Sequence, residues 1–486
     1  MNLDEFSMIT TQRGNDGIIF KDYHFGLKRE NKNGSKIWMC TNKLCKASIK
    51  TQESSIVKTT GIKADGSHDY EHQPKMSFNV YACVQSIKKR IDQEPTAPVS
   101  MLYDQEVKKF RRDHGNAGAV PVFDRIKSSL YEYRSSKQPR VPATLSSITV
   151  PYSLSRTLTN ENFLFCSNVR SIFGFCSLTS LRLLGSNQHW NSDGTFRTAP
   201  RLFYQSYSIH IWDDFSMKPV VYAALPNKTF DTYDSLLNEL ILYAQCNQIT
   251  LAPKSILIDF EIAAYKAFSK NFPMTSIKGC QFHFGQNIWR QIKKKGLISH
   301  SKSDEARRQI ANILSLPLLP PQEIDTAFCC IVEEISEVNP RFLKLTDYIL
   351  RTYISNAIFP PSFWNVFDLI GIRPKTNNHV EGYHGQLNSH CQTHPNLWAW
   401  VRFIQDMEES TMIRVEQEEV QQRTTRRRKA KTVAKENLLI DAKKEYLDGV
   451  LDLAGYQKRL RILSYRYIHV FDSVEKDDAD YEPQLN

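Results

Sequence analysis

The sequence lacks any apolar run that approaches the roughly 18 residues needed to cross a membrane. It also lacks an apolar segment behind a basic start, so MNLDEFSMITTQRGNDG is not expected to be a secretory signal. No internal repeat is evident. These absences favour a reducing compartment, in which the ten cysteines serve as thiols or metal ligands rather than as disulfides.

The composition is that of a globular protein of several domains. A chain of 486 residues suits two to four domains, and 41% hydrophobic with 24% charged residues argues against disorder. The 63 Lys and Arg exceed the 52 Asp and Glu, which gives a net charge of +11. This excess favours a polyanionic partner such as DNA.

Changes in sequence texture divide the chain into four segments. The prediction is a small β-rich module at 15–78, a basic helical segment at 79–150, an α/β core at 151–410 with a helical insertion at about 295–370, and a basic helical tail at 411–486. The second segment is either a DNA-contacting module or a solvated linker.

The core segment alternates between strands and helices. Apolar runs predict strands at 188–196, 205–212, 218–226, 254–260 and 276–284, and helical periodicity predicts helices at 232–245, 261–272 and 285–296. This order predicts an α/β fold with one central mixed sheet.

Two carboxylates stand at the ends of predicted core strands. Asp259 ends the aliphatic run Ile256–Ile258, and Asp193 follows the first strand, with Gly194 marking where the backbone leaves it. If these strands are neighbours, two like charges approach each other, which favours a divalent cation between them. Oxygen ligands suit Mg²⁺ or Mn²⁺, and two such ions can activate a water or a 3′-hydroxyl. Otherwise Asp193 is a turn residue and Asp259 a helix cap.

A third acid usually completes such a site, and Glu381 is the candidate. It lies in a helix-like run for which Asn377 or Asn378 is a suitable N-cap. The alternative is an exposed acid on a helix.

Cysteines and histidines in the first segment have the spacing of a metal site. Cys40 and Cys45 are separated by four residues, and His68 and His72 by three. Such a Cys₂His₂ set can bind Zn²⁺ tetrahedrally, and a module this small needs such a staple. The alternative is core cysteines with surface histidines.

This segment resembles the FLYWCH-type zinc finger. The matching features, besides the cysteines and the terminal histidines, are Phe20, Tyr23, Trp38 and Ala47. The resemblance implies a small β-sheet that binds DNA and one zinc ion. The family usually has one residue between the histidines, whereas this sequence has three, so His72 fits best as the last ligand.

The core resembles the transposase of Mutator-like elements. The matching motifs are DGTF, ILIDFEIAAYKAF, CQFHFGQNIWR and TNNHVEGYHGQLN followed by HPNLWAWVRFIQ. The resemblance implies an RNase H-like fold with a helical insertion, and catalytic acids at Asp193, Asp259 and Glu381.

Three further residues of the core are singled out by this resemblance. Cys280 and His283 form the family's C-x-x-H, either for metal binding or cleavage geometry or as a structural pair. Glu261, where the family often has an acid, either supports Asp259 or caps the next helix.

The tail contains the basic run RTTRRRKAKTVAK, with Arg426, Arg427, Arg428 and Lys429 at its centre. It is a nuclear localisation signal, a strip that contacts DNA phosphates, or a solvated segment.

The leading hypothesis is therefore a nuclear DNA transposase that cleaves DNA and transfers strands, works as a homo-oligomer on DNA and involves no membrane. The rivals are a non-catalytic DNA-binding regulator derived from a transposase, and an unrelated RNase H-like nuclease.

Overall fold

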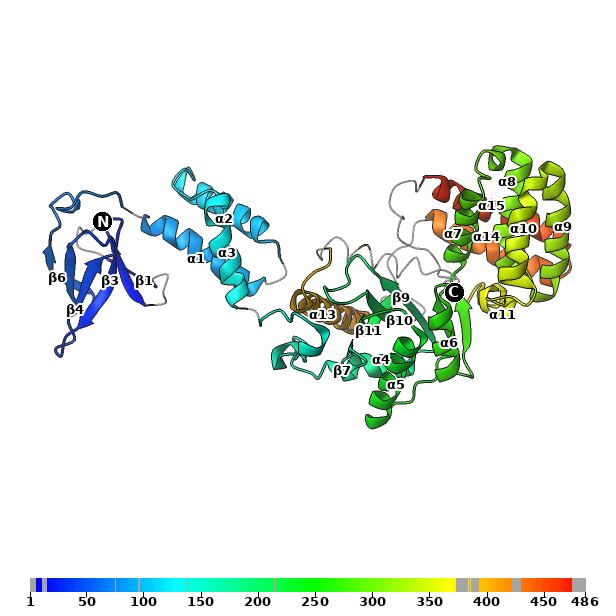
Figure 1. The fold of residues 1–486 in the computed structure, drawn as a ribbon, viewed down its shortest axis with the longest axis horizontal. Coiled ribbons are helices and arrows are strands. Elements are labelled where there is room, and N and C mark those ends of the chain that lie inside the picture. The colour runs from blue at the N-terminus through cyan, green and yellow to red at the C-terminus, as the bar shows by residue number, and fades with distance from the viewer. Residues whose placement is uncertain are drawn as a thin grey trace. The chain divides into compact units, whose positions relative to one another are not determined.

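The structure is a computed structural model of the chain. It describes residues 6–10, 15–74, 76–94, 97–137, 139–213, 216–372, 383, 385, 393–421 and 430–473. The chain forms two compact units, Met1–Arg140 and Val141–Asn486, and each is described by itself (Figure 1).

The first unit begins with a six-stranded antiparallel sheet in chain order. Its strands are β1 (Ser7–Thr10), β2 (Asp16–Phe20), β3 (Tyr23–Glu30), β4 (Lys36–Cys40), β5 (Ser48–Gln52) and β6 (Ser55–Thr60). Lys21 and Asp22 join β2 to β3 with φ of 47° and 65°, the left-handed backbone that suits a two-residue hairpin. The core is small and centres on Phe25, Trp38 and Ile49, so the sheet has little apolar burial to hold it together.

Three helices complete the first unit: α1 (Phe78–Gln93), α2 (Val99–His114) and α3 (Phe123–Ser136). They lie in the segment predicted to be helical, and each buries one apolar stripe in a shared core that includes Ile87, Leu102 and Leu130. The hydroxyl of Tyr81 on α1 accepts from the Thr10 amide at 3.1 Å and donates to its carbonyl at 3.0 Å. The helices are thereby attached to the edge strand β1.

The second unit is built on a seven-stranded mixed sheet, which confirms the predicted α/β class. Its strands are β7 (Leu164–Val169), β8 (Ile172–Phe175), β9 (His189–Thr195), β10 (Gln205–Trp212), β11 (Met217–Leu225), β12 (Ser255–Ile258) and β13 (Ser276–Gly279). The spatial order is β13-β12-β9-β10-β11-β8-β7. Strand β12 runs parallel to β9 and β13, and the other pairs are antiparallel.

Helices cover both faces of this sheet (Figure 1). Alternate residues of β11 show the two sides: Val221 and Ala223 belong to one core, Tyr222 and Ala224 to the other. The first core includes α4 (Leu178–Ser186), α5 (Phe230–Cys246) and α6 (Ile262–Asn271); the second includes α13 (Leu397–Gln421). Because packed side chains cover both faces of the sheet, β10 and β11 are buried along their whole length.

The remaining helices form what we call the helical lobe. Its members are α7 (Gln281–Lys294), α8 (Asp304–Ser315), α9 (Ile324–Val338), α10 (Leu343–Ile349), α11 (Pro361–Trp364), α14 (Ala430–Leu447) and α15 (Leu453–Ser473). The last two come from the predicted tail, yet their apolar residues lie in the same core as α8 and α9. The hydroxyl of Tyr456 on α15 donates to the carbonyl of Leu318 at 3.0 Å. Within the described part of the chain, no helix has the length and hydropathy to span a membrane.

Candidate functional site

Asp193 lies near the end of β9, and Asp259 directly follows the neighbouring parallel strand β12. The pairing of β12 with β9 sets Ile256 against Trp190 and Leu257 against Asn191. Asp259 directly follows the last residue of β12, and continuing this register by two residues sets it against Asp193 of β9. Both side chains line one pocket, which is the arrangement that favours a bound cation.

The same pocket collects residues from four other segments. Its lining is Ser192, Asp193, Gly194, Phe196, Gln205, Tyr207, Lys228, Ile258, Asp259, Glu261 and Ala264. Lys228 lies in the loop that follows β11. Because β11 runs in the same direction as β9, this loop begins at the same end of the sheet as Asp193. Sequence reasoning missed Lys228; the available signal was a cation three residues after a fully buried strand.

Glu261 belongs to the pocket and does not cap α6 with its side chain. It occupies the N-cap position of α6 without a side-chain cap hydrogen bond. Instead its Oε1 accepts a hydrogen bond from the Tyr233 hydroxyl at 2.8 Å, and Gln205 Nε2 donates to that hydroxyl at 2.5 Å. Lys228 Nζ is 3.9 Å from Glu261 Oε2. Glu261 thus occupies the N-cap position without capping α6 through its side chain, and its support of Asp259 stays a prediction.

Gly194 is a strand residue, which corrects its interpretation as the point where the backbone leaves the strand. Strand β9 continues to Thr195, and Gly194 pairs with Tyr207 of β10. A Cβ at Gly194 would lie 2.4 Å from Gln205 Oε1. Glycine is therefore needed here for the close approach of Gln205, and not for a turn.

Cys280 and His283 lie at a strand-to-helix junction. The strand predicted to reach Phe284 is wrong beyond Gly279, because Cys280 is the N-cap of α7 and His283 lies in its first turn. His283 Nδ1 is 3.2 Å from Asp259 Oδ1. Burial alone would lower the pKa of His283, but Asp259, Cys280 and Asp193 raise it well above its usual value. His283 is thus held as a cation against Asp259.

Burial dominates the ionisation of the other two acids. It raises the pKa of Asp193 to about 7; His283 opposes this rise and Asp259 adds to it. It also raises the pKa of Glu261 to about 7, against the effects of Lys228 and the Tyr233 hydrogen bond. Both side chains therefore bind protons near neutral pH that an unfolded chain would have released.

These raised pKa values predict that divalent-cation binding depends on pH. A cation binds the deprotonated carboxylates, so the affinity for Mn²⁺ should rise as the pH increases through about 7, with protons released on binding. Without a cation, stability should fall as the pH rises from about 4 to 7, because the folded state binds more protons than the unfolded state. Calorimetric titration in buffers of different ionisation enthalpy measures the released protons. Glu261→Gln should reduce the number of protons released on cation binding. An unchanged number would show that Glu261 does not hold one of these protons.

Two sets of predicted residues lie outside the described residues. These are Glu381 and the basic residues Arg426, Arg427, Arg428 and Lys429. Tyr383 is described: it is buried, and its ring centroid is 4.9 Å from that of His210 on β10. His210 in turn pairs with Asn191 of β9.

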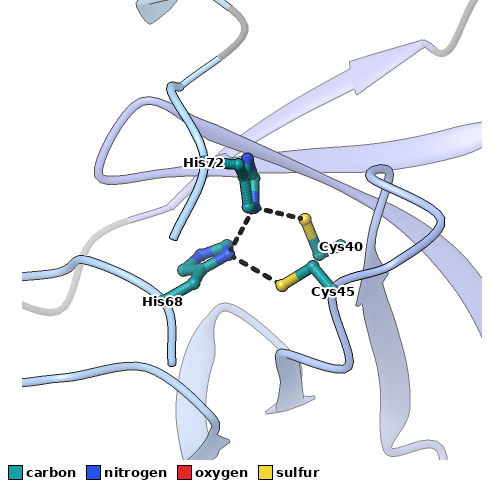
Figure 2. A group of neighbouring side chains, drawn as sticks. All are labelled: Cys40, Cys45, His68 and His72. Atoms are coloured by element: carbon teal, nitrogen blue, oxygen red, sulfur yellow. Dashed lines mark hydrogen bonds between the residues drawn. The ribbon is translucent and has the colours of Figure 1, made fainter. Parts of the chain in front are cut away.

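A second site lies in the first unit, where Cys40, Cys45, His68 and His72 converge (Figure 2). Cys40 ends β4, Cys45 lies in the following loop, and both histidines come from the segment after β6. Their ligand atoms all lie within 4.8 Å of one another, and among the described residues no other group of three or more such atoms does so. Cys280 and His283 are therefore not part of such a cluster.

The distances come within about 0.2 Å of those in a tetrahedral zinc site. Cys40 Sγ is 3.5 Å from His72 Nε2, Cys45 Sγ is 3.2 Å from His68 Nδ1, and the two histidine nitrogens are 3.1 Å apart. Ligands at ordinary zinc distances would stand about 3.3 to 3.8 Å from each other. His68, the less secure candidate in the sequence, has a place in the cluster, and the ring of Tyr23 stacks on it at 3.9 Å.

Burial shifts the pKa of two members of this cluster. Burial raises the pKa of Cys40 to about 11, so its thiol keeps its proton unless a cation displaces it. Burial lowers the pKa of His68, with His72 adding to the effect, which leaves the ring neutral and able to bind.

Comparison with known proteins gives one family. Residues 189–287 match the family model of the MULE transposase domain. The match begins with β9 and ends within α7, so it includes Asp193, Asp259, Cys280 and His283. It supports the resemblance of the core to Mutator-like transposases and does not reach the first unit. No curated protein matches the chain.

Proposed function

We propose that this chain, which carries a MULE transposase match at residues 189–287, is a DNA transposase of the Mutator-like type. The observation that carries the proposal is the register of Asp193 and Asp259 on adjacent parallel strands within the matched residues. Glu381 would supply the third acid. Tyr383, two residues further along the chain, packs against the strand next to β9.

The order of the central strands supports an RNase H-like core. Among the five strands β9 to β13, β9 comes first in the chain and lies in the middle of the spatial order. The antiparallel strands β10 and β11 follow on one side, and the parallel strands β12 and β13 on the other. In this proposal the helices at about 295–370 are the insertion that separates the last acid from the sheet.

The chain's own residues would prepare the DNA for cleavage. Bound Mg²⁺ or Mn²⁺ would supply Lewis acidity and an activated oxygen nucleophile. Asp193 and Asp259 offer the hard oxygen ligands that such ions prefer, and His283 fixes the orientation of Asp259. In the first reaction, a water oxygen bonds to phosphorus and the 3′-oxygen leaves. In the second, that 3′-hydroxyl attacks a target phosphodiester, and a target 3′-oxygen leaves.

The first unit would recognise DNA. We propose that its cluster binds Zn²⁺ and that the sheet is a FLYWCH-type finger, because the four ligands have distances close to those of a closed tetrahedral site. The basic residues Arg426 to Lys429 would direct the chain to the nucleus or contact DNA phosphates. Two copies would act together as a homo-oligomer on paired DNA ends.

The test begins with DNA that flanks genomic copies of the gene. Inverted repeats bounded by short direct duplications would identify the substrate. The purified chain should then cleave DNA at the repeat ends with Mg²⁺ or Mn²⁺, and not with chelator present. Specific binding without cleavage under any of these conditions would reject the transposase and favour the DNA-binding regulator. Cleavage without preference for repeat ends would favour the unrelated nuclease.

A further inference from the structure

The loop between β9 and β10, residues 196–204, brings aromatic side chains to the acidic pocket. Phe196, three residues after Asp193, lines the pocket. Tyr204, at the other end of the loop, exposes 52% of its surface. The two rings meet edge to face, with centroids 5.3 Å apart at 66°.

Lys228 lies above both rings and next to the acids. Its Nζ is 4.1 Å from the Phe196 centroid, 5.7 Å from the Tyr204 centroid and 3.9 Å from Glu261 Oε2. Its side chain keeps 22% exposure. The aromatic rings hold the ammonium group at the pocket, where it is within reach of an entering anion.

Backbone hydrogen bonds hold this loop in place. The Arg201 amide donates to the Pro395 carbonyl at 2.9 Å, and the His394 amide donates to the Arg197 carbonyl at 2.9 Å. Leu202 adopts a φ of 82°, unusual for a residue other than glycine, and is also exposed. After Leu202, the Tyr204 amide donates to the Leu225 carbonyl at 2.8 Å, so the exposed ring of Tyr204 is presented by a backbone anchored on both sides of Leu202.

A half-exposed aromatic ring beside an anchored lysine matches the chemistry of a nucleotide. Nucleic-acid bases stack on aromatic side chains, and lysine binds phosphate as a point charge. We propose that Tyr204, Phe196 and Lys228 form a subsite for the nucleotide adjoining the scissile phosphate, with its base on Tyr204 and its phosphate at Lys228. This inference rests on the proposed function for its partner, DNA.

The subsite can be measured as binding, without cleavage. The probe is a short single-stranded oligodeoxynucleotide with 2-aminopurine as its fluorescent base, titrated with the full chain in Ca²⁺. Stacking should quench the fluorescence. Tyr204→Ala should lose the quenching, and both Tyr204→Ala and Lys228→Met should weaken binding about tenfold, the effect of one stacked base or one lost phosphate contact. Tyr204→Trp should retain both.

Tyr152→Ala is the matched control. Tyr152 is also exposed and also lies against a cation, with Arg156 at 4.8 Å from its centroid, but it does not line the pocket. This variant should quench and bind like the wild type. Wild-type quenching and affinity in both Tyr204→Ala and Lys228→Met would overturn the subsite.

Cleavage assays separate this inference from the proposed function. If the variants lose quenching and the wild type cleaves no DNA, the subsite stands and the transposase proposal fails. If the wild type cleaves repeat ends and Tyr204→Ala does so with unchanged KM and kcat, the transposase proposal stands and the subsite fails. If the subsite and the transposase proposal both stand, an abasic nucleotide next to the scissile phosphate should remove most of the difference in cleavage kinetics between the wild type and Tyr204→Ala.

Discussion

Asp259→Asn is expected to lower the rate of DNA cleavage by about a thousandfold, or about 4 kcal/mol of transition-state stabilisation. The reason is that an amide offers one neutral oxygen where the pocket needs a carboxylate to hold a divalent cation opposite Asp193. The variant should also lose its ion pair with His283. Single-turnover cleavage of the repeat ends measures the rate. DNA affinity should change little, because the first unit and the basic residues would carry most of the binding.

Asp231→Asn is the matched control for this experiment. Asp231 is an acid of the same unit, exposed and paired with Arg170 at 3.1 Å, and it does not line the pocket. It should cleave at the wild-type rate. Cleavage by Asp259→Asn at that same rate would show that the pocket is not the site of chemistry, even if the chain is active.

Removal of the metal ligand in Cys40→Ser should unfold the sheet of the first unit. Structural zinc contributes about 10 to 16 kcal/mol to folding in small fingers, which equals or exceeds the stability of most domains. The apolar core of this sheet is too small to compensate. Hydrogen exchange in the full chain should therefore lose protection in residues 16–60 and keep it in residues 189–294. Metal analysis should show the loss of one zinc ion per chain.

Cys246→Ser is the control that distinguishes the loss of a metal ligand from a general effect of losing a thiol. Cys246 is exposed at the end of α5 and far in sequence from the cluster. Its replacement should change neither zinc content nor protection. A sheet that stays protected and zinc-loaded in Cys40→Ser would exclude Cys40 as a ligand.

The sequence predicts those features that depend on local pattern. Alternating strands and helices were readable over residues 189–294 because each strand is a short buried run and each helix has one apolar stripe. The direct pairing of β9 with β12 also follows the expectation for Asp193 and Asp259. The catalytic roles of these acids stay predictions.

Other features depend on packing, which no local pattern encodes. The run SIKGCQFHF keeps the strand-like alternation of polar and apolar residues as far as Phe284, so nothing in it marks the change from strand to helix at Cys280. In the sequence, Gly194 is typical of a turn residue. Only its contact with Gln205 of the next strand explains why a glycine lies within β9. Lys228 lines the pocket and Tyr233 hydrogen-bonds to Glu261, each from a separate segment after β11. The pairing of β9, β10 and β11 brings these segments to the pocket.

The helical lobe has a consequence for synthesis of the chain on the ribosome. Its core is closed by α14 and α15, which are synthesised after the other helices of the lobe: the ring centroids of Phe471 and Trp289 are 6.3 Å apart, and Arg307 pairs with Asp472 at 3.3 Å. The ribosome releases the chain from the N-terminus, so the apolar faces of α8 and α9 stay partly uncovered until α15 has emerged. The first unit can fold long before. A message truncated after α13 would therefore yield a chain that retains Asp193 and Asp259 but is prone to aggregate.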